Sequence, residues 1–185
     1  MKRWICWIMT CLALTVMPAA LATTAANGQW VFPVIKNFGG VHPLPHAAVQ
    51  PDAKATYKAF FYVTWASNSP SKVNPGLEHL ARAVNVMAAS GVPLSQLHYV
   101  ALIHEKAAFS VLRDPYYHLL KGTDNPNLVL LHELHKAGVR LLVCGQALAA
   151  MKVRQSWIDP DGEVSLSALS DEIIYGDKGY AFVDL

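Results

Sequence analysis

Cysteine is scarce in this sequence, and its scarcity excludes a fold held together by disulfides. The 185 residues contain three cysteines, and Cys6 and Cys11 both lie in the apolar stretch that opens the chain. If that stretch is removed, Cys144 is the single cysteine left and no internal disulfide can form. A lone cysteine in an exported protein indicates a reactive thiol or an intermolecular partner. An inert core residue is the alternative, because free cysteine is often buried.

The sequence also lacks the motifs of several enzyme classes. It has no Gly-rich phosphate loop, no nucleophilic-serine elbow and no Cys-x-x-Cys pair. His132 and His135 lack the spacing of four residues that the helical zinc-protease pattern requires. Prolines between His42 and His46 forbid a helix there. We therefore expect no metal site and no cofactor, and interpret His132 and His135 as part of a solvated face or a subunit interface.

The sequence has only a small excess of basic over acidic residues. The chain has 15 basic and 13 acidic residues. Residues 1–22 resemble a signal peptide, with Lys2 and Arg3, an apolar run and an Ala20-Leu-Ala22 cleavage site. An uncleaved membrane anchor is the alternative. Cleavage would reduce the basic residues from 15 to 13 against 13 acidic ones. We expect a periplasmic or secreted, formally neutral protein, with neither nucleic acid nor membrane as its partner after cleavage.

After the leader, the sequence divides into an arm and one domain. Residues 23–56 are rich in Pro, Ala and Gly and predict an extended N-terminal arm that lies on the domain. In residues 57–185, apolar strand-forming stretches alternate with helical patterns, which predicts a three-layer α/β/α fold with a mainly parallel, doubly wound sheet of about five strands. We predict strands at residues 57–65, 97–104, 140–144, 164–166 and 179–184. Asn74-Pro75 and Asn125-Pro126 each predict a helix start, with Asn as the N-cap and Pro at the first helical position.

Cys144 ends the predicted strand of residues 140–144. Ligands and chemistry collect at the carboxyl ends of strands in open α/β sheets. The chain then starts a helix at Gln146, and a helix N-terminus favours an anion such as a thiolate. Gly145 allows a sharp turn and a close approach by a neighbouring group.

Three further polar residues are candidates for the same site. His104 ends the preceding predicted strand and can meet Cys144 at one rim of the sheet, where a histidine can hold a cysteine as thiolate. The alternative is that His104 has only a structural role, in which it caps the end of its strand and hydrogen-bonds to the backbone. Asn125 and Gln146 are the next candidates for substrate contact, although Asn125 is first of all a predicted N-cap.

Several segments, spread over nearly the whole mature chain, resemble the DsrE/DsrF-like family and its exported branch in particular. They are His42-Pro-Leu-Pro45, Val73-Asn-Pro-Gly-Leu77, Ala81-Arg-Ala-Val-Asn85, His104, Asn125-Pro-Asn127, His132-x-Leu-x-Lys-Ala-Gly-Val139, Val143-Cys-Gly-Gln146 and Gly179-Tyr180. The resemblance implies a parallel-sheet α/β/α fold and homo-oligomers, as trimers or hexamers. It also implies sulfur-relay chemistry, because the better understood relatives are cytoplasmic proteins that carry sulfur as a persulfide on the cysteine matching Cys144. Glu105 departs from the pattern, since glycine is expected after His104.

These observations lead to one main hypothesis and two alternatives. The main one is a periplasmic sulfur-carrier or sulfurtransferase-like protein that holds sulfane sulfur on Cys144 and exchanges it with a donor or acceptor thiol protein. The Gly145 N–H and the helix N-terminus would stabilise the anion, and His104 would be an auxiliary base or hydrogen-bond donor. The alternatives are a non-catalytic oligomeric module with Cys144 in a small-ligand cleft between subunits, and a redox-sensing thiol.

Overall fold

The computed structural model describes residues 28–185. The predicted signal peptide therefore lies outside the described residues. Within the described part, none of the helices combines the length and the apolar character that a bilayer span requires.

The centre of the molecule is a five-stranded sheet in the order β4-β3-β2-β1-β5. Every neighbouring pair of strands is parallel. This confirms the predicted fold class, and each predicted strand is present with small shifts at its ends. The strands are β1 (Tyr57–Val63), β2 (Leu97–Ile103), β3 (Arg140–Cys144), β4 (Gly162–Ser165) and β5 (Ala181–Asp184).

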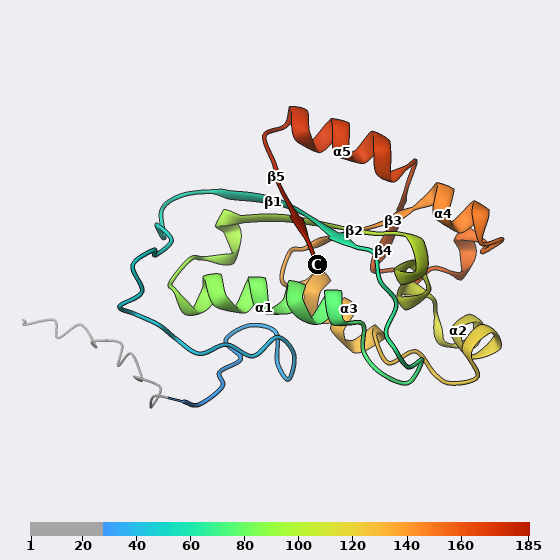
Figure 1. The fold of residues 1–185 in the computed structure, drawn as a ribbon, viewed down its shortest axis with the longest axis horizontal. Helices are drawn as coiled ribbons and strands as arrows, with labels where there is room; N and C mark the ends of the chain where they lie inside the picture. The colour runs from blue at the N-terminus through green and yellow to red at the C-terminus, as the bar shows by residue number, and fades with distance from the viewer. Residues whose placement is uncertain (1–27) are drawn as a thin grey trace, which may run out of the picture.

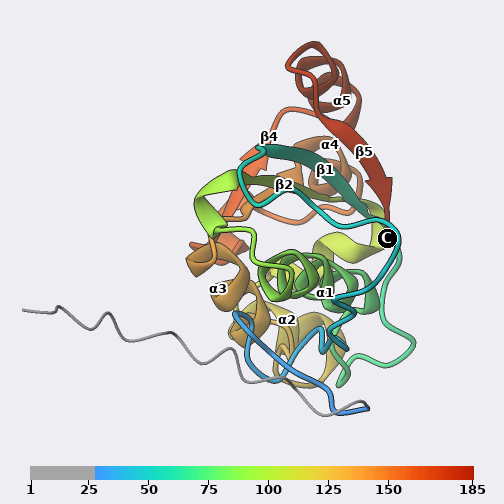
Figure 2. The same ribbon diagram turned by 90° about the vertical axis from the view of Figure 1, so that its left-hand side faces the viewer.

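Helices cover both faces of the sheet and complete the three layers (Figure 1, Figure 2). Helices α1 and α3 lie on one face, and α5 lies on the other. The helices are α1 (Pro75–Ala89), α2 (Asp114–Lys121), α3 (Leu128–Lys136), α4 (Gly145–Ala150) and α5 (Ala168–Asp177), with 3₁₀ turns at Leu94–Gln96, Glu105–Val111 and Gln155–Trp157.

Alternation of side chains along the central strands produces two cores of unequal size. Residues of odd number, such as Ile103 and Val143, join the large core beneath α1 and α3. Strand residues of even number face α5, where Phe60, Val100, Leu102, Leu142 and Cys144 form a smaller cluster with Tyr175 of α5. Cys144 therefore belongs to the α5 side of the sheet, because it follows Leu142 by two residues on β3.

The two Asn-Pro pairs behave differently. Asn74 caps α1 as predicted, and its side-chain oxygen accepts hydrogen bonds from the Gly76 and Leu77 amides. The predicted start of α3 at Asn125-Pro126 is wrong, because α3 begins at Leu128 and Asn127 is its N-cap. The reason is that the Asn125 side chain binds other parts of the chain, as described below.

The arm of residues 28–56 runs along the side of α1 that faces away from the sheet (Figure 1, Figure 2). Asn85, fully buried on α1, binds it through five hydrogen bonds. Its Oδ1 accepts from the amides of Val34 and Ile35, at 3.0 and 2.9 Å. Its Nδ2 donates to the carbonyls of Ile35, Phe38 and Gly39 at 3.0 to 3.1 Å. One side chain thus pairs with five backbone groups of this turn, two amides and three carbonyls.

We predict that Asn85→Leu will destabilise the protein by about 2–4 kcal/mol, because it leaves buried backbone donors and acceptors unpaired. Unfolding in urea, followed by circular dichroism, measures the loss. Asn68→Ala, at an exposed position in the loop after β1, is the control and should change stability by less than about 0.5 kcal/mol. Equal stability of Asn85→Leu and the control would show that the arm is not held by Asn85.

Candidate functional site

Cys144 lies at the carboxyl end of β3, against the first residue of α5. Its Sγ accepts a hydrogen bond from the Ala168 amide at a distance of 3.3 Å. The N-terminal end of α5, a helix of 10 residues, therefore points at the sulfur. Positive dipole ends of helices and free N–H groups stabilise a thiolate. The residue is 4% exposed, so the sulfur lies beneath the start of α5 and not in open solvent.

The two residues after Cys144 contact the same β4–α5 connection. A Cβ added at Gly145 would lie 2.6 Å from the Ser165 carbonyl oxygen, a distance that side chains essentially never adopt. The group that approaches Gly145 closely is therefore the protein's own backbone. Gln146 is exposed, and its Nε2 donates to the Leu166 carbonyl at 3.4 Å. The structure thus brings Cys144, Gly145 and Gln146 together against residues 165–168.

Two polar side-chain groups are buried between α5 and the sheet, on Asp171 of α5 and Tyr62 of β1. Asp171 is 7% exposed, and its Oδ2 has no hydrogen-bond partner among the described residues. The Tyr62 hydroxyl on β1 is also buried, and the Glu172 side chain lies close enough to interact with it. Burial is the main cause, and the nearby carboxylate of Glu172 the second, of a Tyr62 pKa raised to about 12. The phenol therefore keeps its proton. Buried polar groups usually have partners, and exceptions gather at sites that bind or react.

His104 lies on the same side of the sheet. Leu102 pairs with Leu142 in the β2–β3 register. His104 and Cys144 each come two residues after this pair, so they lie at equivalent positions at the ends of adjacent strands. The His104 ring forms a 3.2 Å hydrogen bond between Nε2 and the Thr64 hydroxyl, and it packs edge-on against Tyr62. Burial lowers the pKa of His104, an effect that Glu105 opposes. No hydrogen bond joins His104 to Cys144 in the described chain.

Glu105 adopts the backbone conformation that glycine prefers. Its φ is +49°, in the left-handed region where a side chain costs about 1–2 kcal/mol. The side chain is exposed. The glycine expected at this position from the family resemblance would adopt this conformation without that cost, and this chain keeps the turn with a glutamate.

Asn125 does not join this group. It is 7% exposed, and its Nδ2 donates to the carbonyls of Ser110 and Leu112 at 2.8 and 2.6 Å. Its Oδ1 accepts from the amide and the side chain of Asn127. These bonds link the 3₁₀ helix Glu105–Val111 to the start of α3. The side chain is thus occupied within the chain and lies away from Cys144.

The histidines of α3 also lie elsewhere. His132 Nδ1 is 3.1 Å from an Asp161 carboxylate oxygen, and His135 Nε2 is 3.9 Å from the other. Both histidines are exposed. Residues 28–185 contain no group of three or more His, Cys, Asp or Glu side chains arranged to hold a metal.

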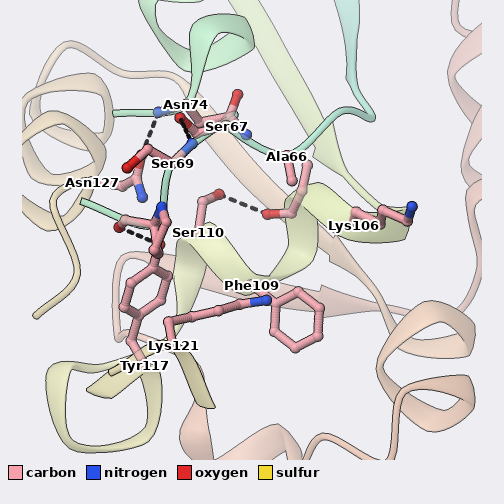
Figure 3. Close-up of a pocket in the computed structure, with 12 residues that line it drawn as sticks. Ala66, Ser67, Ser69, Asn74, Lys106, Phe109, Ser110, Tyr117, Lys121 and Asn127 are labelled. Carbon is pink, nitrogen blue, oxygen red and sulfur yellow. Dashed lines mark hydrogen bonds between the residues drawn. The ribbon is translucent and has the colours of Figure 1, made fainter. Parts of the chain in front are cut away.

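A cavity of about 160 Å³ opens on the other side of the sheet, between the loop after β1, the 3₁₀ helix after β2, and α2 (Figure 3). Cys144 and His104 do not line it. Its lining consists of Ala66, Ser67, Ser69, Pro70, Asn74, Lys106, Ala107, Phe109, Ser110, Tyr117, Lys121 and Asn127.

Sequence reasoning did not identify Ala168, Asp171 and Tyr62 as part of the Cys144 site. Ala168, Asp171 and Tyr175 recur at helical spacing, but so do the more apolar Leu169 and Ile173. The apolar set predicts the opposite buried face. Only the strand order, which places β5 beside β1, decides that α5 crosses above Cys144.

The lowered pKa of His104 predicts a pH dependence of stability. In the folded protein this pKa lies below 6.5, the value of an unperturbed histidine. Between the two values the unfolded chain binds a proton that the folded protein does not, so the free energy of unfolding falls as pH falls through this window. We predict that His104→Gln will reduce this loss of stability in urea titrations at about pH 7.5 and about pH 5.5. A His104 resonance that titrates at or above 6.5 would contradict the assignment.

Comparisons with known proteins agree with this geometry. The model of the DsrE/DsrF-like family matches residues 58–185. A solved structure from Methanobacterium thermoautotrophicum, described as MTH1491, a protein of unknown function, is similar with a TM-score of 0.52 and 19% identity over 70% of this chain and 99% of that chain. At that identity the likeness shows the fold alone. No curated protein matches. The match to the family model covers the sheet, all five helices and Cys144, and the chain belongs to the DsrE/DsrF-like family.

Proposed function

We propose that this protein is a periplasmic sulfur carrier that holds sulfane sulfur as a persulfide on Cys144. The observation that carries the proposal is the contact between the Cys144 sulfur and the N-terminus of α5. A helix N-terminus stabilises the thiolate that attacks and the persulfide anion that results. Membership of a family that suggests sulfur-relay-like function supports the same chemistry.

The loading step balances with a sulfane-sulfur donor such as thiosulfate. The Cys144 thiol loses its proton, and the thiolate attacks the outer sulfur of the donor. A new S–S bond forms on Cys144 while the S–S bond of thiosulfate breaks, and sulfite leaves with the electron pair. In the reverse sense, the thiolate of an acceptor attacks the outer sulfur of the persulfide and regenerates the Cys144 thiolate. No external oxidant or reductant is needed.

His104 is the proposed acceptor of the thiol proton. Its lowered pKa keeps the imidazole neutral at pH 7, and a neutral imidazole can accept a proton. It shares the rim and the face of the sheet with Cys144. Gly145 keeps the backbone close to Ser165, and this proximity holds the start of α5 over the sulfur.

Burial of Cys144 has a consequence for access. Because the sulfur lies beneath Ala168, a donor reaches it only when the start of α5 moves. Few side chains oppose that movement, since Asp171 and Tyr175 are the only buried residues of α5. Once loaded, the persulfide is shielded from bulk solvent by the same segment.

We predict that incubation with thiosulfate or polysulfide will add sulfur to the protein in a form that a reductant removes. Intact-mass spectrometry measures the gain, and Cys144→Ser should show none while keeping the thermal melting curve of a folded protein. Because the site is covered, cyanide should remove the sulfur from Cys144 slowly. The comparison is a persulfide formed on an exposed cysteine, introduced by Ser71→Cys in the Cys144→Ser background, from which removal should be faster. Loading that persists in Cys144→Ser, or a wild-type protein that takes up no sulfur, would refute the carrier role.

We also propose that the protein forms homo-oligomers, and that the outward face of α5 is the contact between copies. Leu166, Leu169 and Ile173 are each more than 70% exposed and form an apolar surface on and next to α5, with the exposed Glu172 beside it. Such a surface is self-complementary, because each copy can bury its own apolar area against that of another. The trimers or hexamers expected for the family support this choice of a second copy as the occupant.

The double variant Leu169→Asp/Ile173→Asp should therefore shift the protein to smaller species in analytical ultracentrifugation, since it places charge in an apolar contact. Val129→Asp is the matched control, because Val129 is an apolar residue 66% exposed on α3, and it should leave the mass unchanged. Dissociation by the control as well, or by neither variant, would remove α5 from the contact between copies.

A further inference from the structure

The cavity of Figure 3 combines positive charge with a surplus of hydrogen-bond donors. None of its twelve lining residues carries a carboxylate, whereas Lys106 and Lys121 both carry an ammonium group. Neither lysine forms an ion pair in the described part of the chain. The Lys121 ammonium lies 3.8 Å from the centre of the Phe109 ring, at the side of the cavity where Figure 3 draws both side chains. The two exposed lysines thus place cationic charge at the mouth of the cavity, and no protein anion of the described residues pairs with it.

The side-chain amide oxygens of the lining are already engaged, whereas the Ser67 hydroxyl and the two lysines are free to donate hydrogen bonds. Asn74 Oδ1 binds the first turn of α1, and Asn127 Oδ1 accepts from the Asn74 amide at 2.7 Å. The Ser67 hydroxyl accepts from the Ser69 amide and donates to no other group of residues 28–185. Each lysine offers three donors and no acceptor. A ligand that accepts hydrogen bonds and carries negative charge satisfies this set, and a cation does not.

Two helices add to the positive potential. Asn74 caps α1 with its side chain, and Asn127 occupies the N-cap position of α3 without a side-chain capping bond. Both residues line the cavity, so the N-termini of both helices lie at its wall. Each contributes about half a positive charge. The helices contain 15 and 9 residues, long enough for a developed dipole. These dipoles reinforce the lysine charge and do not replace it.

The size of the cavity restricts the ligand. A volume of about 160 Å³ is below the 300–1,000 Å³ of pockets that enclose drug-sized ligands, which excludes a nucleotide or coenzyme. It suffices for a molecule of about benzene size.

We infer that this cavity is a binding site for a small oxyanion, either an inorganic one such as sulfate, phosphate or thiosulfate, or a short carboxylate. Lys121 is the main electrostatic contact, Ser67 is a hydrogen-bond donor, and Lys106 contributes from the rim. The site is separate from Cys144, because it lies on the α1 side of the sheet and Cys144 on the α5 side. Its existence does not depend on sulfur carriage.

Isothermal titration calorimetry at constant ionic strength tests the inference, with thiosulfate, sulfate, phosphate, acetate and malonate as probes. The Cys144→Ser protein is used throughout, so that sulfur chemistry contributes no heat. We expect saturable binding of at least one probe, weakened about tenfold or more by Lys121→Gln and less by Lys106→Gln. Lys136→Gln, which removes an exposed charge at the end of α3 outside the cavity, should leave the affinity unchanged.

The pattern of probes identifies the source of the anion. Preference for the tetrahedral ions indicates an inorganic ligand, and preference for acetate or malonate indicates a carboxylate; either result supports the site. Absence of saturable binding for all five probes would overturn the inference. Equal weakening by Lys121→Gln and Lys136→Gln would overturn it as well, because it would show a general charge effect.

Discussion

Because all neighbouring strands of the sheet are parallel, every connection must return from the carboxyl edge to the amino edge before the next strand begins. Such crossovers are right-handed. The steps from β1 to β4 move in one direction and place their helices on one face. The step from β4 to β5 passes back over the sheet to the far side of β1, so its helix lies on the opposite face. The pairing of strands therefore determines both where Cys144 lies, at the carboxyl rim, and that α5 starts above it.

The character of α5 follows from that position. Its inward stripe of Ala168, Asp171 and Tyr175 covers a small cluster, and its outward side is apolar. A helix in an isolated domain normally buries its apolar face. The N-terminus of α5 covers the Cys144 sulfur, and the proposed contact with a second copy would bury its outer apolar residues. In the proposed function, weak packing of α5 against the sheet would allow a donor or acceptor to reach the sulfur.

The sequence allows prediction where local rules decide the structure. The apolar run of residues 140–144 and the Asn74-Pro75 cap gave β3 and α1 correctly, because strand burial and capping depend on adjacent residues. The identical Asn125-Pro126 pair gave a wrong start for α3. Asn125 instead binds the carbonyls of Ser110 and Leu112, which only the tertiary fold brings near. Asn85 was not predicted to hold the arm, because its partners lie about fifty residues earlier in the chain. Ala168 and Asp171 required the strand order, which no local pattern encodes.

The most direct test of the account is the chemical state of Cys144 in the protein taken from its own cells. Thiols are blocked at lysis during growth on a source of sulfane sulfur, and the peptide that contains Cys144 is examined by mass spectrometry. Our account predicts a fraction of this peptide with one additional sulfur atom between Cys144 and the blocking group. A peptide that carries only the blocked thiol, under conditions in which other cellular persulfides are detected, would contradict it.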